Sequence, residues 1–422
     1  MTTDTIFSVD LADPAIHANP YPTYARMRRE APVMEVKGRG YMGKAWLVTR
    51  YNDVLAVLKD PRFVNDRRNL GEGGDLPWWM PRAMRVMSNT MVSLDDPAHA
   101  RLKSLVHKAF TPRMIEGLAG RVERIANELL DRAEKKGAVD LVAEFALPLP
   151  MTVISEMLGV PEKERPKFRH YISNLLDAPP SNVARLLTGI RNNRRMIGYL
   201  DKLIAHRRAN PDDGLITALV TAEQAGDRLT GDELTGLVFL LLLAGHETTV
   251  NLIGNGTLAL LENPDQLALL RSDPALVKPA VEELLRYTNP VEHGVMRFAR
   301  EDVELSGVTI PKGDTVVGML SSANRDETVF ENAEELRIAR DPNRHLAFGI
   351  GMHFCLGAPL ARMEGAIAFN ALVQRFPDLR LAVAPKEIRW RSGAPNFRGL
   401  KALPVHLGSG SLSTLAEPSI AR

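Results

Sequence analysis

The sequence predicts a mainly α fold with a smaller β region, built as one large unit. Three observations support this prediction. Apolar residues recur at helical spacing over long stretches in the middle of the chain. Short runs typical of β-strands occur near the beginning and again late in the chain. Pro and Gly are scattered as punctuation, and no repeat, low-complexity block or internal linker divides the 422 residues.

The first two thirds of the chain predict one strand followed by three helices. The run "AWLVTR" (45–50) predicts a strand, and "YNDVLAVLKDPRF" (51–63) predicts a short helix stopped by Pro61. From Ile115 to Leu129 apolar side chains fall on one helical face, and Gly137 closes that helix. Residues 235–264 predict a long helix that is apolar nearly all round at its start, which places it in the core.

The later elements return to β structure. Residues 274–287 predict one more helix. Strand signals follow in "VELSGVTI", in "TVVGML" after the turn "PKGD", and finally in "LRLAVA" and "LPVHL". We expect strands near the two ends of the chain to pair with each other. The domain is expected to span 1–407, and the residues 408–422, "GSGSLSTLAEPSIAR", are expected to form a flexible C-terminal tail.

Composition and charge exclude several classes of protein. Lys and Arg number 53 against 51 Asp and Glu, a formal charge of +2, so no nucleic-acid partner is indicated. A single cysteine excludes an internal disulfide and a Cys-rich zinc site. The N-terminus lacks the basic and apolar regions of a secretory signal. The most apolar run, Leu237 to Ala244, is far shorter than the roughly 20 residues that span a bilayer. We expect a cytoplasmic monomer without membrane attachment.

The only cysteine, Cys355, lies in the glycine-rich run "HLAFGIGMHFCLGAP". A thiolate acts as a nucleophile, a redox switch or a metal ligand. Phe348, Gly351, Cys355 and Gly357 fit the pattern F-x-x-G-x-x-x-C-x-G, in which glycines let the backbone turn tightly against a flat cofactor. A predicted helix follows, and its N-terminal end favours a thiolate at Cys355.

This run resembles the haem-binding loop of the cytochrome P-450 superfamily. The resemblance implies the superfamily's triangular single-domain fold, with haem b (iron protoporphyrin IX) as cofactor. It implies that Cys355 is the proximal iron ligand and that Phe348, Gly349, His353 and Gly357 contact the cofactor. The alternative from the residues alone is a buried structural cysteine, the commonest fate of a lone thiol.

A second motif, "AGHETT" (244–249), lies in the middle of the long predicted helix. It is similar to the distal-helix motif of the same superfamily. The similarity implies that Ala244 and Gly245 leave room for dioxygen and that Glu247 and Thr248 deliver protons to it. His246 has no role in that motif. The purely structural alternative is that Thr248 bonds the carbonyl four residues back and Glu247 has an ordinary partner.

Further residues match positions that hold the haem or brace the fold. The resemblance assigns His99, Lys103, Arg297 and His353 to the haem propionates, although many relatives carry Arg where Lys103 stands. Solvated surface charges are the alternative. Glu283 and Arg286 in "EELLR", with Arg340 upstream of the cysteine loop, match a structural brace.

The resemblance implies a monooxygenase that inserts one oxygen atom from dioxygen into a C–H bond of a lipophilic molecule. A polyketide, macrolide, steroid or terpenoid-like substrate fits the bacterial members that the wording resembles. Trp78, Trp79 and nearby methionines match the pocket lid, and Glu292 with His293 a polar edge of the pocket.

Electrons would come from NAD(P)H through a separate ferredoxin or flavodoxin and its reductase. That partner would dock near a basic patch of Lys103, Lys108, Arg344 and Arg362. A haem-thiolate peroxygenase, a haem-based sensor or carrier, and a cofactor-free helical protein are the alternatives. Peroxide-using relatives typically replace the acid and alcohol with Arg and Pro, whereas this chain has Glu247 and Thr248.

Overall fold

The structure, a computed structural model, describes residues 13–37, 44–71, 78–165, 183–224, 229–391 and 396–408. The expected C-terminal tail therefore lies outside the described residues, apart from Gly408. The α-helices are α1 (Pro14–Ala18), α2 (Tyr21–Glu30), α3 (Tyr51–Lys59), α4 (Arg82–Ser88), α5 (Ala98–Ala109), α6 (Pro112–Glu134), α7 (Pro148–Met157), α9 (Val183–Ala209), α10 (Leu215–Gln224), α11 (Gly231–Glu262), α12 (Pro264–Ser272), α13 (Val277–Thr288), α14 (Leu320–Ala323) and α15 (Ala358–Arg375). The strands are β1 (Val33–Lys37), β2 (Lys44–Val48), β3 (Phe63–Val64), β4 (Ala138–Asp140), β5 (Arg297–Ala299), β6 (Val303–Leu305), β7 (Val308–Ile310), β8 (Thr315–Gly318), β9 (Arg380–Leu381) and β10 (Pro404–His406).

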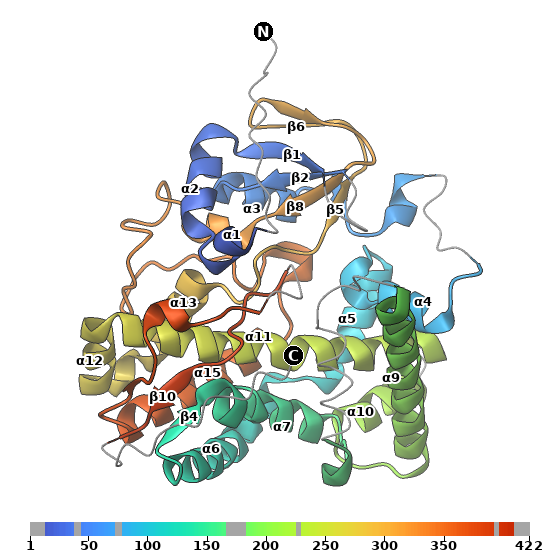
Figure 1. Cartoon of the computed structure of the whole chain (residues 1–422). Coiled ribbons are helices and arrows are strands. Elements are labelled where there is room, and N and C mark those ends of the chain that lie inside the picture. The colour runs from blue at the N-terminus through green and yellow to red at the C-terminus, as the bar shows by residue number, and fades with distance from the viewer. Residues whose placement is uncertain are drawn as a thin grey trace.

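The helix α11 forms the axis of the molecule and crosses its whole width (Figure 1). It begins at a capping box, in which the Thr230 side chain accepts from the Glu233 N–H and the Glu233 carboxylate accepts from the Thr230 N–H. By length and composition α11 is apolar enough to cross a membrane, but 67% of its most apolar window is buried inside the protein. It is therefore a core helix, as its uninterrupted apolar start predicts.

The β region forms the narrow end of a roughly triangular outline, with α2 and α3 beside it (Figure 1). Its largest sheet has the order β1-β2-β8-β5-β3, and β2 pairs with β8 in parallel. The predicted pairing of early and late strands is thus confirmed. A second sheet, β4-β10-β9, joins the chain's last described strand to the segment after α6. The run "VELSGVTI" is a hairpin of β6 and β7 rather than one strand, because Ser306 and Gly307 turn it at positive φ.

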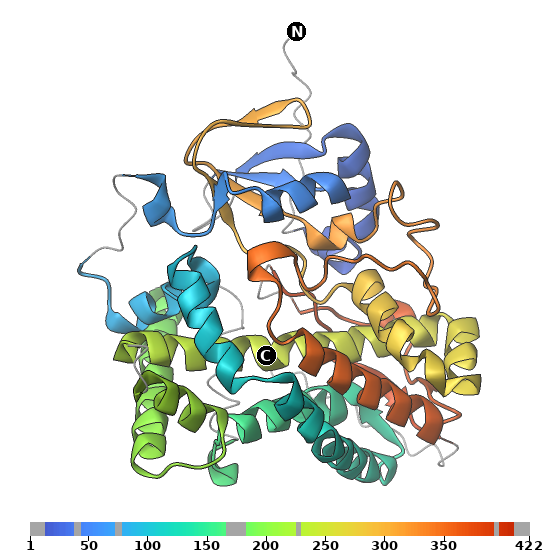
Figure 2. The same ribbon diagram turned by 180° about the vertical axis from the view of Figure 1, so that it is seen from behind.

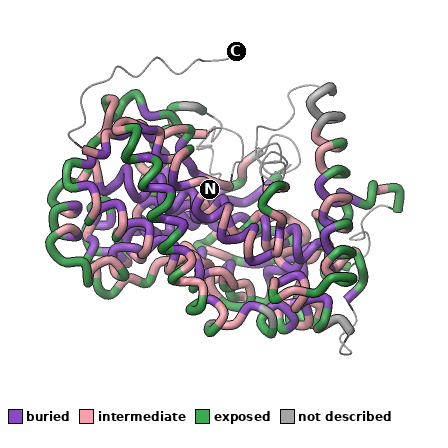
Figure 3. The backbone as a smooth tube through the Cα atoms, turned by 90° about the horizontal axis from the view of Figure 1, so that it is seen from below, coloured by how far each residue is buried: buried purple, intermediate pink, exposed green. Residues whose placement is uncertain are grey.

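The site segments are positioned by the crossing of α11 with α15. A side chain at Gly256 of α11 would lie 2.5 Å from the Phe369 ring of α15. A side chain at Gly365 of α15 would lie 3.1 Å from Leu252 of α11. The two glycines therefore allow the helices to approach closely. Seen from behind, α15 also lies along α6 (Figure 2), and buried residues gather in the interior of the molecule (Figure 3).

Candidate functional site

The cysteine loop is held in shape by two glycines and one backbone hydrogen bond. The Cys355 N–H donates to the Phe348 carbonyl at 2.9 Å, which closes the loop. Gly349 and Gly351 have φ values of +65° and +77°, a region that other residues rarely adopt. Gly351 also lies against the backbone, since an added Cβ would come within 3.4 Å of the Leu58 carbonyl oxygen.

The sulfur of Cys355 lies just before the first turn of α15. Burial raises the pKa of the Cys355 thiol, whereas the N–H groups of Gly357 and Ala358 and the charge of Arg362 act in the opposite direction. Backbone donors and a helix N-terminus are the features that support a thiolate once a metal cation neutralises its charge. Without a cation the buried sulfur favours its neutral form.

Arg362 is already occupied by other contacts. Its guanidinium donates to both oxygens of Glu282 in α13, at 2.6 and 2.8 Å, and stands 4.5 Å from the centre of the Phe348 ring. His345 approaches the same carboxylate at 3.0 Å. Arg362 therefore fixes α15 and Phe348 to α13, which reduces its availability as part of the predicted docking patch.

A buried cluster of basic side chains lies beside the loop. The His99 and His353 rings are 4.3 Å apart between centres, and the charges of Arg297 and Lys103 act on His353. His99 and Arg297 are buried, and burial together with these neighbours lowers the pKa of His353 to about 3. The structure thus brings together the four side chains that the sequence assigned to one anionic group.

The Arg297 guanidinium is the least satisfied member of this cluster. It is 6% exposed, and its two nearest acceptors are the Leu58 and Phe63 carbonyl oxygens, both at 3.5 Å. Within the described part of the chain its Nε has no hydrogen-bond partner, and neither has Nε2 of His353. A buried cation without an anion is costly, so the cluster fits a carboxylate-bearing ligand. Lys103 is half-buried and donates to the Met352 carbonyl oxygen at 2.6 Å.

The α11 segment places Thr248 and Ala244 together. The Thr248 hydroxyl donates to the Ala244 carbonyl oxygen at 3.0 Å. Ala244 is exposed although most of α11 around it is buried. A side chain at Gly245 would lie 2.9 Å from Ile154 of α7, whereas the role of this glycine beside dioxygen stays a prediction. Gly245 therefore serves helix packing, and Ala244 is the small residue on the open side of α11.

Glu247 is buried and forms an ion pair with Arg391. Arg391 belongs to the C-terminal hairpin, in which residues 389–391 pair antiparallel with residues 399–401. Arg391 also donates to the Asn251 amide oxygen at 3.0 Å. A side chain at Gly399 would overlap that oxygen, which explains the glycine. Sequence reasoning missed Arg391 and Gly399 because they belong to no motif and lie about 140 residues from their partners.

His246, for which the sequence offered no role, is a buried residue of α11. Its Nδ1 lies 3.0 Å from the Leu242 carbonyl oxygen, and burial lowers its pKa to about 4. A neutral imidazole that bonds its own helix is a structural feature rather than part of a proton path.

The predicted brace is confirmed. Arg286 donates through Nε and Nη2 to the two Glu283 oxygens at 2.7 and 2.8 Å, and both side chains are fully buried. Arg340 adds contacts of 3.1 Å to the same carboxylate.

The predicted polar pocket edge is corrected, since the Glu292 carboxylate accepts from Tyr24 at 2.8 Å and Ser321 at 2.7 Å inside the fold. Trp78 and Trp79 are 92% and 68% exposed.

Together the fold and the site fit a thiolate-ligated metalloprotein whose cofactor carries carboxylates. A soft sulfur donor at a helix N-terminus, unsatisfied buried cations and a small residue on the facing helix fit haem. A profile described as "Cytochrome P450" matches residues 39–387. The chain belongs to the cytochrome P450 family.

Its relatives are bacterial enzymes of this family. "Polyketide biosynthesis cytochrome P450 PksS" of Bacillus subtilis is 47% identical over 93% of this chain and 96% of its own length. The solved structure of PksS superposes with a TM-score of 0.87 at 45% identity, covering 95% of this chain and 100% of that one. "Cytochrome P450 monooxygenase PikC" of Streptomyces venezuelae is 46% identical over 93% of this chain and 92% of its own. "6-deoxyerythronolide B hydroxylase" of Saccharopolyspora erythraea is 41% identical, over 94% and 98%. The chain is therefore an oxidoreductase, a haem b monooxygenase that uses a redox partner and a small-molecule substrate.

Proposed function

We propose that this monooxygenase hydroxylates a polyketide or macrolide, working in the cytoplasm as a monomer with a ferredoxin or flavodoxin as electron donor. The support is the similarity, along nearly the whole chain, to the polyketide biosynthesis enzyme PksS and to 6-deoxyerythronolide B hydroxylase. The partly exposed residues of α11 beside Ala244 include Leu240, Leu241 and Leu243, an apolar surface suited to a lipophilic substrate. Residues 1–407 act as one catalytic domain.

The observation that carries the assignment of the site is the cysteine loop. Cys355 would hold the iron, with Phe348, Gly349 and Gly357 shaping the loop beneath the cofactor. His99, Lys103, Arg297 and His353 would bind its carboxylates, and the unsatisfied Arg297 guanidinium is the strongest of these donors. When bound, the haem supplies dioxygen activation and the transfer of one oxygen atom.

Thr248 and Glu247 would handle the protons of the reaction. Because the Thr248 hydroxyl hydrogen is used on the Ala244 carbonyl, its oxygen lone pairs remain able to accept a hydrogen bond. Glu247 is held by Arg391, so it passes a proton toward Thr248 only when that ion pair loosens. In this arrangement Thr248 positions the proton and Glu247 resupplies it.

Spectral titration with candidate substrates tests the proposal. The haem-loaded protein would be mixed with macrolactones, linear polyketides, steroids and fatty acids, and the Soret shift followed by product analysis with a ferredoxin system. Tight binding and hydroxylation of a macrolactone or polyketide are expected. Turnover confined to steroids or fatty acids would replace the proposed substrate class, and a reduced, carbon monoxide-bound spectrum without the thiolate band would overturn the site assignment.

A further inference from the structure

Among the residues that the structure describes, one buried acid, namely Glu364, forms no hydrogen bond of ordinary geometry within the fold. Glu364 of α15 is 1% exposed, and neither of its carboxyl oxygens has a hydrogen-bond partner among the residues that the structure describes. Buried polar atoms are nearly always hydrogen-bonded, and an isolated buried carboxylate is strongly disfavoured. A side chain of this kind in a well-packed helix crossing therefore needs a physical explanation.

The surroundings of Glu364 hold it in its neutral form. Burial raises the pKa of Glu364 to about 8, and the Thr249 hydroxyl on the facing α11 acts in the opposite direction. Several charged groups on the four helices that pack against α15 have partners of their own. They include Glu247 of α11 with Arg391, Glu282 and Glu283 of α13 with Arg362 and Arg286, Asp131 and Glu134 of α6 with Arg375, and Arg271 of α12 with the Val373 carbonyl.

Glu364 also lies close to both halves of the cofactor site. It is six residues beyond Ala358, about 9 Å along α15 from the helix start that follows Cys355. The Thr249 hydroxyl, which acts on the Glu364 carboxyl from the facing helix, belongs to the residue next to Thr248. At such separations in a protein interior, a unit change of charge at the iron acts strongly on a buried acid, since little water screens it.

We infer that Glu364 is a redox-linked protonation site, which binds a proton from solvent when the haem accepts an electron and releases it when the haem is reoxidised. The inference rests on the proposed attachment of haem to Cys355. The electron comes from the redox partner, and the proton balances its charge. Because coupling is reciprocal, a proton on Glu364 makes the haem easier to reduce, and its loss makes reduction harder.

The coupling has a pH window of its own. Burial lowers the pKa values of both His353 and His99 from the ordinary value of 6.5, so these two site residues are neutral at pH 7 and above. Between about pH 7 and 9 Glu364 is the acid beside the loop that changes its charge. Between its pKa in the oxidised state and its higher pKa in the reduced state, the reduced-to-oxidised ratio at fixed potential falls by up to about tenfold per pH unit, and it is level outside that interval.

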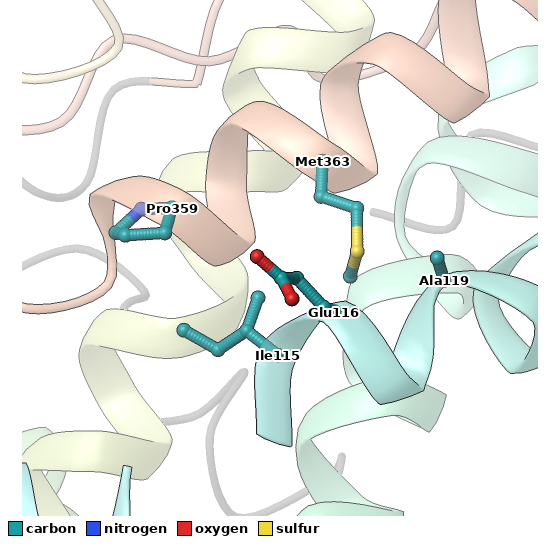
Figure 4. A pocket seen from close by; sticks show the side chains of 5 residues that line it. All are labelled: Ile115, Glu116, Ala119, Pro359 and Met363. Atoms are coloured by element: carbon teal, nitrogen blue, oxygen red, sulfur yellow. The ribbon is translucent and has the colours of Figure 1, made fainter. Parts of the chain in front are cut away.

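Potentiometric titration of the haem-loaded protein from pH 6.5 to 9.5 tests the inference. The wild type is expected to become harder to reduce as the pH rises through about 8, whereas Glu364→Gln stays level. Glu116→Gln is the matched control, because Glu116 faces the start of α15 from the groove that it lines with Ile115, Ala119, Pro359 and Met363 (Figure 4), but is exposed. It should behave as the wild type does.

A second measurement needs no variant. Infrared difference spectra of the wild type, reduced minus oxidised at pH 8, should show a gain of protonated carboxylic acid on reduction. A level potential in the wild type, or a pH slope retained by Glu364→Gln, would overturn the inference while the thiolate spectrum remained normal. Loss of that spectrum in the wild type would instead overturn the proposed haem attachment, so the two failures are distinguishable.

Discussion

Two residues of the cofactor site, Cys355 and Arg297, lie in surroundings that favour a bound metal and a bound anion. Cys355 is a half-buried thiol beside groups that favour its charged form, and Arg297 is a buried cation that forms no ion pair among the described residues. Each arrangement is unfavourable alone, and each becomes favourable when a metal and a carboxylate are supplied. The site is thus organised for haem before haem binds.

Replacing the ligand tests the role of the sulfur. Cys355→His should remove the thiolate-type spectrum of the reduced, carbon monoxide-bound protein and abolish oxygen insertion, because imidazole donates less electron density to iron. Haem content should fall less than activity, since Arg297 and its neighbours are unchanged. Absorbance and haem quantification measure both. A thiolate spectrum retained in the variant would contradict the assignment.

Thr248 has a well-matched control in the same helix. Thr257 makes the same bond to a carbonyl four residues back, from its hydroxyl to Ile253 at 2.7 Å, but is buried away from the motif. Thr248→Ala should still bind haem and substrate, while product formation falls by about 100- to 10,000-fold, the usual contribution of a positioned proton donor. Reducing equivalents should then leave as hydrogen peroxide.

The measurement is product formed per NAD(P)H consumed, with peroxide assayed in parallel. Thr257→Ala should keep the wild-type ratio, because it loses only the helix bond. Equal ratios for Thr248→Ala and Thr257→Ala would mean that Thr248 merely satisfies its own backbone.

Whole elements show where sequence reasoning succeeds and where it stops. The helix α6 follows from its apolar periodicity and α11 from a long run that is apolar nearly all round, and α15 was expected after the cysteine loop. The C-terminal hairpin was not, because its strands are short and its role depends on Arg391 and Gly399 meeting α11 from far along the chain. The importance of Glu364 could not be predicted from the sequence either, since only its burial distinguishes it from a surface glutamate.

The brace between α13 and the segment before the cysteine loop can be tested against a pair of the same spacing. Glu283→Ala leaves the buried Arg286 without its carboxylate, which should cost about 3–5 kcal/mol of folding stability. Glu162 and Arg165 have the same sequence spacing, but Glu162 is exposed and Arg165 pairs with Glu156 instead. Glu162→Ala should cost at most about 1 kcal/mol. Denaturant unfolding of the haem-loaded proteins would measure both, and equal losses would contradict a special role for the brace.

The molecule as a whole is closed by contacts between its two ends. Arg398, in the C-terminal hairpin, donates to the Ala18 carbonyl oxygen at 2.9 Å and lies 3.7 Å from the Trp390 ring centre. Tyr24 reaches Glu292 from the same N-terminal region. These contacts join the N-terminal helices, the C-terminal hairpin and the segment before β5. The contacts of Arg398 with Ala18 and of Tyr24 with Glu292 join residues 380 and 268 apart, so no local sequence pattern predicts them.

The folding stability of the whole molecule should fall at both acidic and alkaline pH. Arg362 and His345 lower the pKa of Glu282 to about 2, so its stabilising contribution is complete above about pH 4.5 and is lost as the pH falls toward 2. Burial lowers the pKa of His246 to about 4, so the unfolded chain binds more protons below about pH 6.5, and stability falls there also.

Glu364 acts in the opposite direction at higher pH. Its folded pKa of about 8 lies above the ordinary value of 4.5, so the folded state holds a proton that the unfolded chain has released, and stability declines as the pH rises between those values. Glu364→Gln removes this term, because an amide does not titrate. Denaturation midpoints of the haem-loaded wild type from pH 4 to 9 should therefore decline on the alkaline side, and the variant should decline less. The acid side should be the same for both proteins, since Glu282 and His246 are unchanged. Parallel alkaline curves would show that Glu364 ionises in the folded protein as it does in solution, and that the helix crossing does not hold its proton.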